Sequence, residues 1–228
     1  MCAWLNTSES LTLLDELRAL PLLAVLRPFH PLEAVSRIAL LAAAGIRHVE
    51  IAWSPSPRWS HDCRELVRRF PAIRFGAASV RSIEALEAAR QAGFSFAFSP
   101  VLDPALQSCA QRLGIGLVPG VFSPTEVQQA LGLGCAAVKL FPATTLGPGY
   151  WGSLAAALEP LPFCIAAGGL EVAHLDAWLQ GGVDALALGS TLFEPLHAAG
   201  AAPRLDPRLA GWVAAYVSAA AADHQRLH

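Results

Sequence analysis

Short apolar stretches alternate with longer amphipathic ones along most of the chain. Eight of the short stretches predict β-strands, namely Leu22–Arg27, His48–Trp53, Arg74–Ser79, Phe96–Pro100, Ile115–Gly120, Ala136–Pro142, Phe163–Gly169 and Ala185–Ser190. Segments between them carry apolar residues at helical spacing, namely Pro31–Ala44, Ser82–Gln91, Pro104–Leu113, Ser123–Leu133 and Leu170–Gln180. Several of these segments begin at Ser or Asp followed by proline and end at glycine, which are ordinary helix-capping signals.

This alternation predicts a single α/β domain over residues 1–228, a TIM (β/α)8 barrel whose core spans about residues 21–193. A doubly wound open sheet is the alternative. We prefer the barrel because the strands number eight and no G-x-G-x-x-G follows an early strand. Glu9–Leu20 is expected to be an extra N-terminal helix that plugs the barrel, Pro207–Ala222 the last outer helix and Ala198–Pro203 a connector.

Composition narrows the function classes. Hydrophobic residues make up 54% and charged residues 15% of the chain, and the formal net charge is −2, so there is no basic footprint for nucleic acid. The five cysteines include no C-x-x-C pair, which favours reduced thiols in a cytoplasmic protein. We see neither a signal-peptide pattern nor an apolar run of membrane-spanning length, and therefore expect no membrane partner.

Lysine occurs once in the chain, at Lys139, whereas arginine supplies the other fifteen basic residues. Lys139 lies in the apolar run Ala136–Pro142 and shares its strand face with Ala137 and Phe141. A buried lysine has a lowered pKa and can form a Schiff base, which arginine cannot. A strand-end lysine that reaches the solvent is the alternative interpretation.

Glu50 shows the same alternation in its predicted strand. Val49 and Ile51 suit the helix layer, so Glu50 should point into the barrel. A carboxylate there is costly unless it is paired or used, and it could form an ion pair with Arg27 or Lys139, act as a general acid and base, or do both. Together, Lys139 and Glu50 indicate imine chemistry, with the cationic imine as the electron sink for C–C cleavage.

Glycines close the last two predicted strands, as Gly168-Gly169 and Gly189-Ser190. Barrels often bind phosphate at the loops after strands seven and eight, where glycine lets the backbone approach the anion. Two tight strand–helix turns are the simpler alternative. Their occurrence at both positions favours a phosphate site.

The motifs now match a known family over about Pro21 to Phe193. They are Leu22–Arg27, Val49-Glu50-Ile51, Phe75–Val80, Ser99-Pro100, Leu117–Gly120, Val138–Ala143, Gly147–Tyr150, Gly168-Gly169 and Leu188–Ser190. In them the chain resembles the class I 2-keto-3-deoxy-6-phosphogluconate (KDPG) aldolases and their phosphogalactonate relatives, which include 4-hydroxy-2-oxoglutarate (KHG) aldolases.

The resemblance implies a homotrimeric barrel that needs no metal or other cofactor and cleaves a phosphorylated keto sugar acid to pyruvate and glyceraldehyde 3-phosphate. It implies that Lys139 is the Schiff-base lysine and Glu50 the general acid and base. The remaining roles it implies are substrate binding by Arg27, Ser79, Pro100 and Phe141, and phosphate binding by Gly168, Gly169, Gly189 and Ser190.

Three positions depart from the family pattern. Ala78, Ser54 and Ala167 stand where the family usually has Gly, Arg and Thr, and the Ser54-Pro55 turn favours the galactonate branch. These changes leave open the configuration of the substrate, KHG aldolase activity, and a non-catalytic phosphosugar-binding barrel. A metal-dependent enzyme is a further alternative, although the seven histidines form no H-x-H or H-E-x-x-H motif and His48 is expected to hydrogen-bond in the core.

Overall fold

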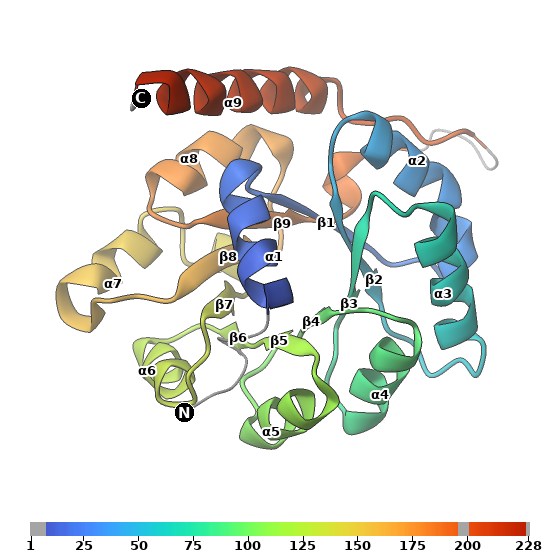
Figure 1. The fold of residues 1–228 in the computed structure, drawn as a ribbon. Coiled ribbons are helices and arrows are strands. Elements are labelled where there is room, and N and C mark those ends of the chain that lie inside the picture. Colours follow the sequence, from blue (N-terminus) through green and yellow to red (C-terminus); the bar gives the residue numbers. More distant parts are fainter. Residues whose placement is uncertain (1–7, 196–200, 227–228) are drawn as a thin grey trace.

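Nine parallel strands form a nearly closed barrel surrounded by helices (Figure 1). The computed structural model describes residues 8–195 and 201–226. Its strands are β1 (Leu22–Leu26), β2 (His48–Ala52), β3 (Arg74–Ala78), β4 (Phe96–Phe98), β5 (Gly116–Val118), β6 (Gly120–Val121), β7 (Ala137–Leu140), β8 (Phe163–Ala167) and β9 (Ala185–Leu188). The first strand in the sequence, β1, pairs with the last, β9. The predicted barrel is confirmed, and the open doubly wound sheet is wrong.

The ninth strand arises at Pro119, which divides the predicted strand Ile115–Gly120 into β5 and β6. Proline has no backbone N–H and cannot donate a ladder hydrogen bond. The hydrogen-bonded sheet therefore begins with β5 and ends with β6. The carbonyl of Pro119 still accepts a 2.8 Å hydrogen bond from the backbone N–H of Lys139, so β7 stays attached at this break.

The α-helices are α1 (Ser8–Ala19), α2 (Val35–Ala43), α3 (Trp59–Arg69), α4 (Ile83–Gln91), α5 (Pro104–Leu113), α6 (Pro124–Gly132), α7 (Tyr150–Leu158), α8 (Leu175–Gln180) and α9 (Pro207–Arg226). Short 3-10 turns are η2 (Pro31–Ala34), η3 (Ala143–Thr145), η4 (Val172–His174) and η5 (Ser190–Leu192). Two predicted helices, those over 31–44 and 170–180, therefore begin as 3-10 turns. Asp103 and Ser123 cap α5 and α6 with their side chains, as the sequence signals predict.

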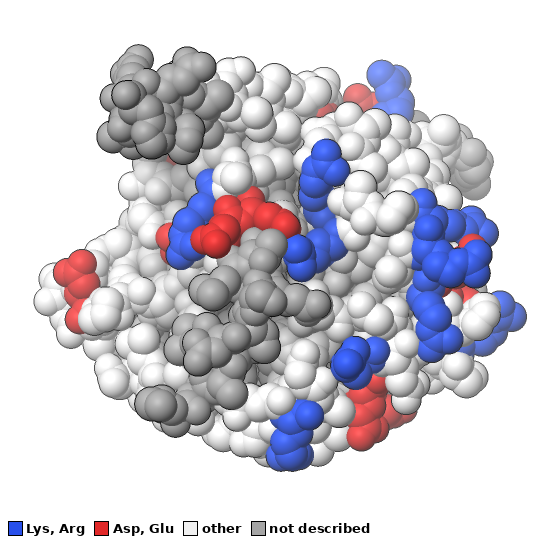
Figure 2. Space-filling model, viewed as in Figure 1, with Lys and Arg blue, Asp and Glu red and all other residues white. Residues whose placement is uncertain are grey.

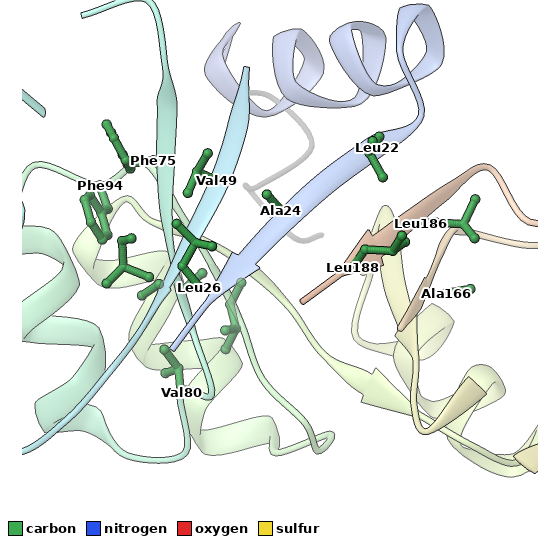
Figure 3. Packing of buried hydrophobic residues seen from close by; sticks show 14 of the residues in the cluster. Leu22, Ala24, Leu26, Val49, Phe75, Val80, Phe94, Ala166, Leu186 and Leu188 are labelled. Atoms are coloured by element: carbon green, nitrogen blue, oxygen red, sulfur yellow. The ribbon is translucent and has the colours of Figure 1, made fainter. Parts of the chain in front are cut away.

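The apolar core has two layers. The outward side chains of the strands, including Leu22, Leu26 and Leu188, pack with residues of the surrounding helices (Figure 3). The inward side chains pack inside the barrel, and there Leu13, Leu14 and Leu17 of α1 join them. Helix α1 thus plugs the amino-terminal end of the barrel, as expected for the extra helix.

Ion pairs hold α1 at that end. Glu16 accepts hydrogen bonds from Arg74 of β3 at 2.9 and 3.0 Å and lies 2.8 Å from Nε2 of His48 on β2. Figure 2 shows acidic and basic side chains side by side over α1. Because α1 closes this end, access to the barrel interior lies at the carboxyl ends of the strands.

The predicted connector 198–203 is only partly described. Its residues 198–200 lie outside the described part of the chain, and residues 201–203 are irregular. Among the described residues, no helix combines the length and the apolar character needed to cross a membrane.

Candidate active site

Lys139 lies inside the barrel because β7 alternates its side chains between the two core layers. Val138 and Leu140 belong to the outer layer, whereas Ala137 belongs to the inner one. The lysine is 5% exposed, and its Nζ lies 5.5 Å from the ring centre of Phe98 and 5.6 Å from that of Phe141. These aromatic faces stabilise a cation there without hydrogen-bonding to the nitrogen lone pair.

Glu50 is fully buried on β2, and neither of its carboxylate oxygens has a hydrogen-bond partner among the described residues. Burial raises the pKa of this carboxyl group to about 7, against the opposing positive charges of Lys139 and Arg27. An unpartnered buried carboxyl group lowers stability, so its presence indicates a functional role. With a pKa near neutrality it can both donate and accept a proton.

The pKa of Lys139 is shifted in the complementary direction. Burial lowers it from the usual lysine value, the charge of Arg27 lowers it further, and the charge of Glu50 opposes both. Desolvation therefore favours the pair in which the amine is neutral and the carboxyl group is protonated. A neutral amine is the nucleophilic form required to attack a carbonyl carbon.

A cavity of about 160 Å³ opens from Lys139 toward the ends of β8 and β9. Its lining brings together seven of the ten predicted site residues: Arg27, Lys139, Phe141, Gly168, Gly169, Gly189 and Ser190. A reactive amine, a guanidinium group and two glycine turns therefore share one concave site.

The Gly168-Gly169 turn requires glycine at both positions. Both residues have positive φ, 97° and 77°. A Cβ on Gly168 would lie 3.0 Å from the Phe141 ring, and one on Gly169 would lie 2.6 Å from Oγ1 of Thr144. The Thr144 hydroxyl donates a 3.1 Å hydrogen bond to the Gly168 carbonyl and so fixes the turn against the loop that follows Lys139.

The sequence of residues 13–199 matches the family model for KDPG and KHG aldolases. The chain belongs to the KDPG and KHG aldolase family. Members of this family are aldolases, and the protein is accordingly a carbon–carbon lyase.

Relatives and solved structures agree with this assignment. A probable 2-dehydro-3-deoxy-6-phosphogalactonate aldolase of Rhizobium meliloti (strain 1021) is 32% identical over 181 residues, which cover 79% of this chain and 85% of the relative. A solved structure described as native KDPGal has a TM-score of 0.71 and 28% identity, covering 91% of this chain and 97% of its own. KDPG aldolase from Legionella pneumophila, solved with pyruvate captured as a covalent carbinolamine intermediate, has a TM-score of 0.68 and 26% identity, covering 77% of this chain and 84% of its own.

Three predicted residues of this aldolase lie outside the cavity lining: Glu50, Ser79 and Pro100. Glu50 still acts on the site through its charge. Ser79 has φ 61°, and among the described non-glycine residues it alone has a positive φ. The backbone of Pro100 packs against Gly120, where a Cβ would lie 2.3 Å from the Pro100 carbonyl carbon.

The aldolase cavity also has wall residues that were not predicted from the sequence: Val25, Ala167, Leu170, Ala187 and Thr191. Ala187 lies two residues before Gly189, so strand alternation could have identified it. Thr191 could not be identified that way, because it lies in η5, where its hydroxyl donates a 2.7 Å hydrogen bond to the Leu170 carbonyl.

His48 lies at the opposite end of the barrel from the cavity. Its Nε2 lies 2.8 Å from a carboxylate oxygen of Glu16, which is the core hydrogen bond expected for it. Within the described part of the aldolase, no three His, Cys, Asp or Glu side chains gather as a metal site would require.

Proposed function

We propose that the protein is a class I Schiff-base aldolase that cleaves a 2-keto-3-deoxy-6-phospho sugar acid to pyruvate and glyceraldehyde 3-phosphate. The observation that carries the proposal is the burial of one amine and one unpartnered carboxyl group in the same barrel, with pKa values shifted toward each other. The Legionella relative, captured with covalently bound pyruvate, supports it.

In this mechanism the neutral Nζ of Lys139 attacks the C2 ketone and forms a carbinolamine. Glu50 donates the proton with which the C2 hydroxyl leaves as water, which gives the iminium ion. The Glu50 carboxylate then takes the C4 hydroxyl proton, directly or through water. The C3–C4 bond breaks, its electron pair moves to the iminium nitrogen, and the aldehyde leaves. Glu50 returns the proton to C3 of the enamine, and water releases pyruvate and the free amine.

The cavity lining offers groups that suit both anionic ends of the substrate. Arg27 would hold the carboxylate by charge-assisted hydrogen bonds. The Gly168-Gly169 and Gly189-Ser190 turns would take the phosphate through backbone N–H groups. Alanine at position 167 places no hydroxyl beside the middle of the substrate. The residues that line the middle of the cavity therefore leave the choice among gluconate, galactonate and KHG substrates to a direct kinetic comparison.

We further propose a cytoplasmic homotrimer. The four described cysteines are buried thiols, which suits a reducing compartment. Sedimentation or light scattering would give the oligomeric state, and a monomer would contradict this part of the proposal.

Borohydride reduction in the presence of pyruvate tests the chemistry. We expect one reduced pyruvyl adduct, which peptide mapping places on Lys139. Since the chain has no second lysine, only the N-terminal amine can compete. Lys139→Met is the matched control and should give no adduct while its circular dichroism remains that of the wild type.

A folded wild type that gives no adduct at saturating pyruvate would overturn the aldolase mechanism and leave a phosphosugar-binding barrel. If the adduct forms, coupled detection of pyruvate ranks the substrates by kcat/KM. The KDPG and phosphogalactonate substrates should both exceed KHG, because KHG carries no phosphate for the glycine turns.

A further inference from the structure

A second and larger cavity, of about 630 Å³, lies beside the active site. It is lined by the end of β1, the start of α2 and the chain that follows β9, segments that Figure 1 places around the first strand. Four residues line both cavities: Val25, Arg27, Ser190 and Thr191. An occupant of the second cavity would therefore touch the wall of the active site.

The second cavity carries two guanidinium groups, those of Arg27 and Arg37. Among the side chains that the structure describes, those of residues 13–195 and 201–218, neither has a carboxylate within ion-pairing distance. The one acidic side chain in the lining, Glu194, pairs with Arg204 at 3.2 Å. The cavity therefore has a surplus of positive charge, although the whole chain has a formal net charge of −2.

The two guanidinium groups occupy different parts of the cavity. Arg37 lies over the ring of Phe193, with its Cζ 5.6 Å from the ring centre, which orients the guanidinium plane. Arg27 reaches the boundary with the active site, since its Nη1 lies 3.7 Å from the position that a Cβ on Gly189 would take. Apolar walls complete the cavity, among them Leu26, Pro28 and Ala34.

We propose that this cavity binds a small polyanion, one anionic group meeting Arg37 and a second meeting Arg27. Phosphate esters and polycarboxylates share the required chemistry, because arginine binds either group through two parallel hydrogen bonds. Binding would draw Arg27 away from the substrate carboxylate and so inhibit the enzyme. The inhibition rests on the proposed function, whereas the binding does not.

Calorimetric titration with inorganic pyrophosphate and with citrate tests the binding on the full chain. The wild type is expected to bind at least one of them, and the preferred probe identifies the ligand as a phosphate ester or a polycarboxylate. Arg37→Met should weaken binding about 10- to 100-fold, in line with the loss of a charge-assisted contact. Arg37→Lys keeps the charge but not the planar guanidinium group, so its affinity for the probe should lie between those of the wild type and Arg37→Met.

Arg112→Met is the matched control, because Arg112 is an exposed arginine on α5, away from both cavities. It should bind the probe as the wild type does. Probe binding that is equal in the wild type and in Arg37→Met would overturn the proposal, because the anion would then sit only at the glycine turns. Absence of binding to the wild type at about 1 mM, an affinity near 4 kcal/mol, would also overturn it.

The regulatory consequence is read from the rate of borohydride trapping with pyruvate. The bound probe should slow trapping in the wild type and in Arg112→Met but not in Arg37→Met, while trapping without probe stays equal in all three. If no imine can be trapped at all, the proposed function fails, and the calorimetry still decides whether the second site exists.

Discussion

Glu50→Gln should make the protein more stable, and the gain should grow with pH. In the folded chain the pKa of this carboxyl group is about 7, against 4.5 as its ordinary value. As pH rises from 4.5 to 7 the unfolded chain ionises while the folded chain stays protonated, so stability falls, and above pH 7 the full loss is present. With about 1.4 kcal/mol per pKa unit, this loss is about 1 kcal/mol at pH 5 and about 3 kcal/mol at pH 8.

Glutamine does not ionise and is free of this loss. The stability difference between Glu50→Gln and the wild type should therefore increase by about 2 kcal/mol from pH 5 to pH 8. Urea unfolding at several pH values measures it, with the slope m compared to exclude changes in the unfolded state. The comparison of two pH values cancels any fixed packing difference between the two side chains.

Lys139 also contributes to this change. Because the charge of Glu50 raises the pKa of Lys139, the glutamine variant holds a more strongly neutral amine, and this too raises its relative stability with pH. Repeating the pair of measurements in a Lys139→Met background removes that contribution. A difference that stays flat within about 0.5 kcal/mol in both backgrounds would refute the argument that burial raises the pKa of Glu50.

Other changes test single parts of the site and the fold. Glu50→Gln should lower kcat about 10²- to 10⁴-fold, as expected for loss of a general acid and base, and steady-state kinetics that leave kcat unchanged would contradict that role. Gly168→Ala should raise KM for the phosphorylated substrate more than for pyruvate in the trapping assay, because its Cβ meets the Phe141 ring at 3.0 Å. Ser79→Gly should stabilise the chain by about 1 kcal/mol in urea unfolding by relieving its positive φ, whereas Ser79→Ala should bring no such gain. Asp103→Ala should cost about 1 kcal/mol in the same assay, with unchanged kcat, since it removes the cap bonds to Ala105 and Leu106 at one end of α5.

Much of the barrel could be predicted from sequence because the alternation of side chains between the two faces of a strand is a local property. The apolar neighbours of Glu50 and Lys139 require the outer core, so both functional side chains had to face inward. The break at Pro119 was visible in the sequence as a residue without an N–H. Whether such a residue divides a strand depends on the pairing of the neighbouring strands. That pairing is set by the closure of the whole barrel, which the local sequence does not show.

The cavity walls were harder to predict. Thr191 enters the site through the bend of η5, and the composition of a strand carries no signal for such a bend. Arg37 gave no signal either, because a single arginine on an amphipathic helix ordinarily lies in solvent. Its importance comes from its place in the cavity with no ion-pairing carboxylate among the described side chains, and spacing along the chain does not reveal that.

The burial of the only lysine has a consequence for the rest of the molecular surface. An aldolase releases an aldehyde at each turnover, and aldehydes condense with the free amines of surface lysines. The exposed cations of this protein are arginines, and its single lysine is 5% exposed within the barrel. The enzyme therefore offers its own product almost no side-chain amine to modify outside the site, and reagents that acylate amines would act on it chiefly as active-site titrants.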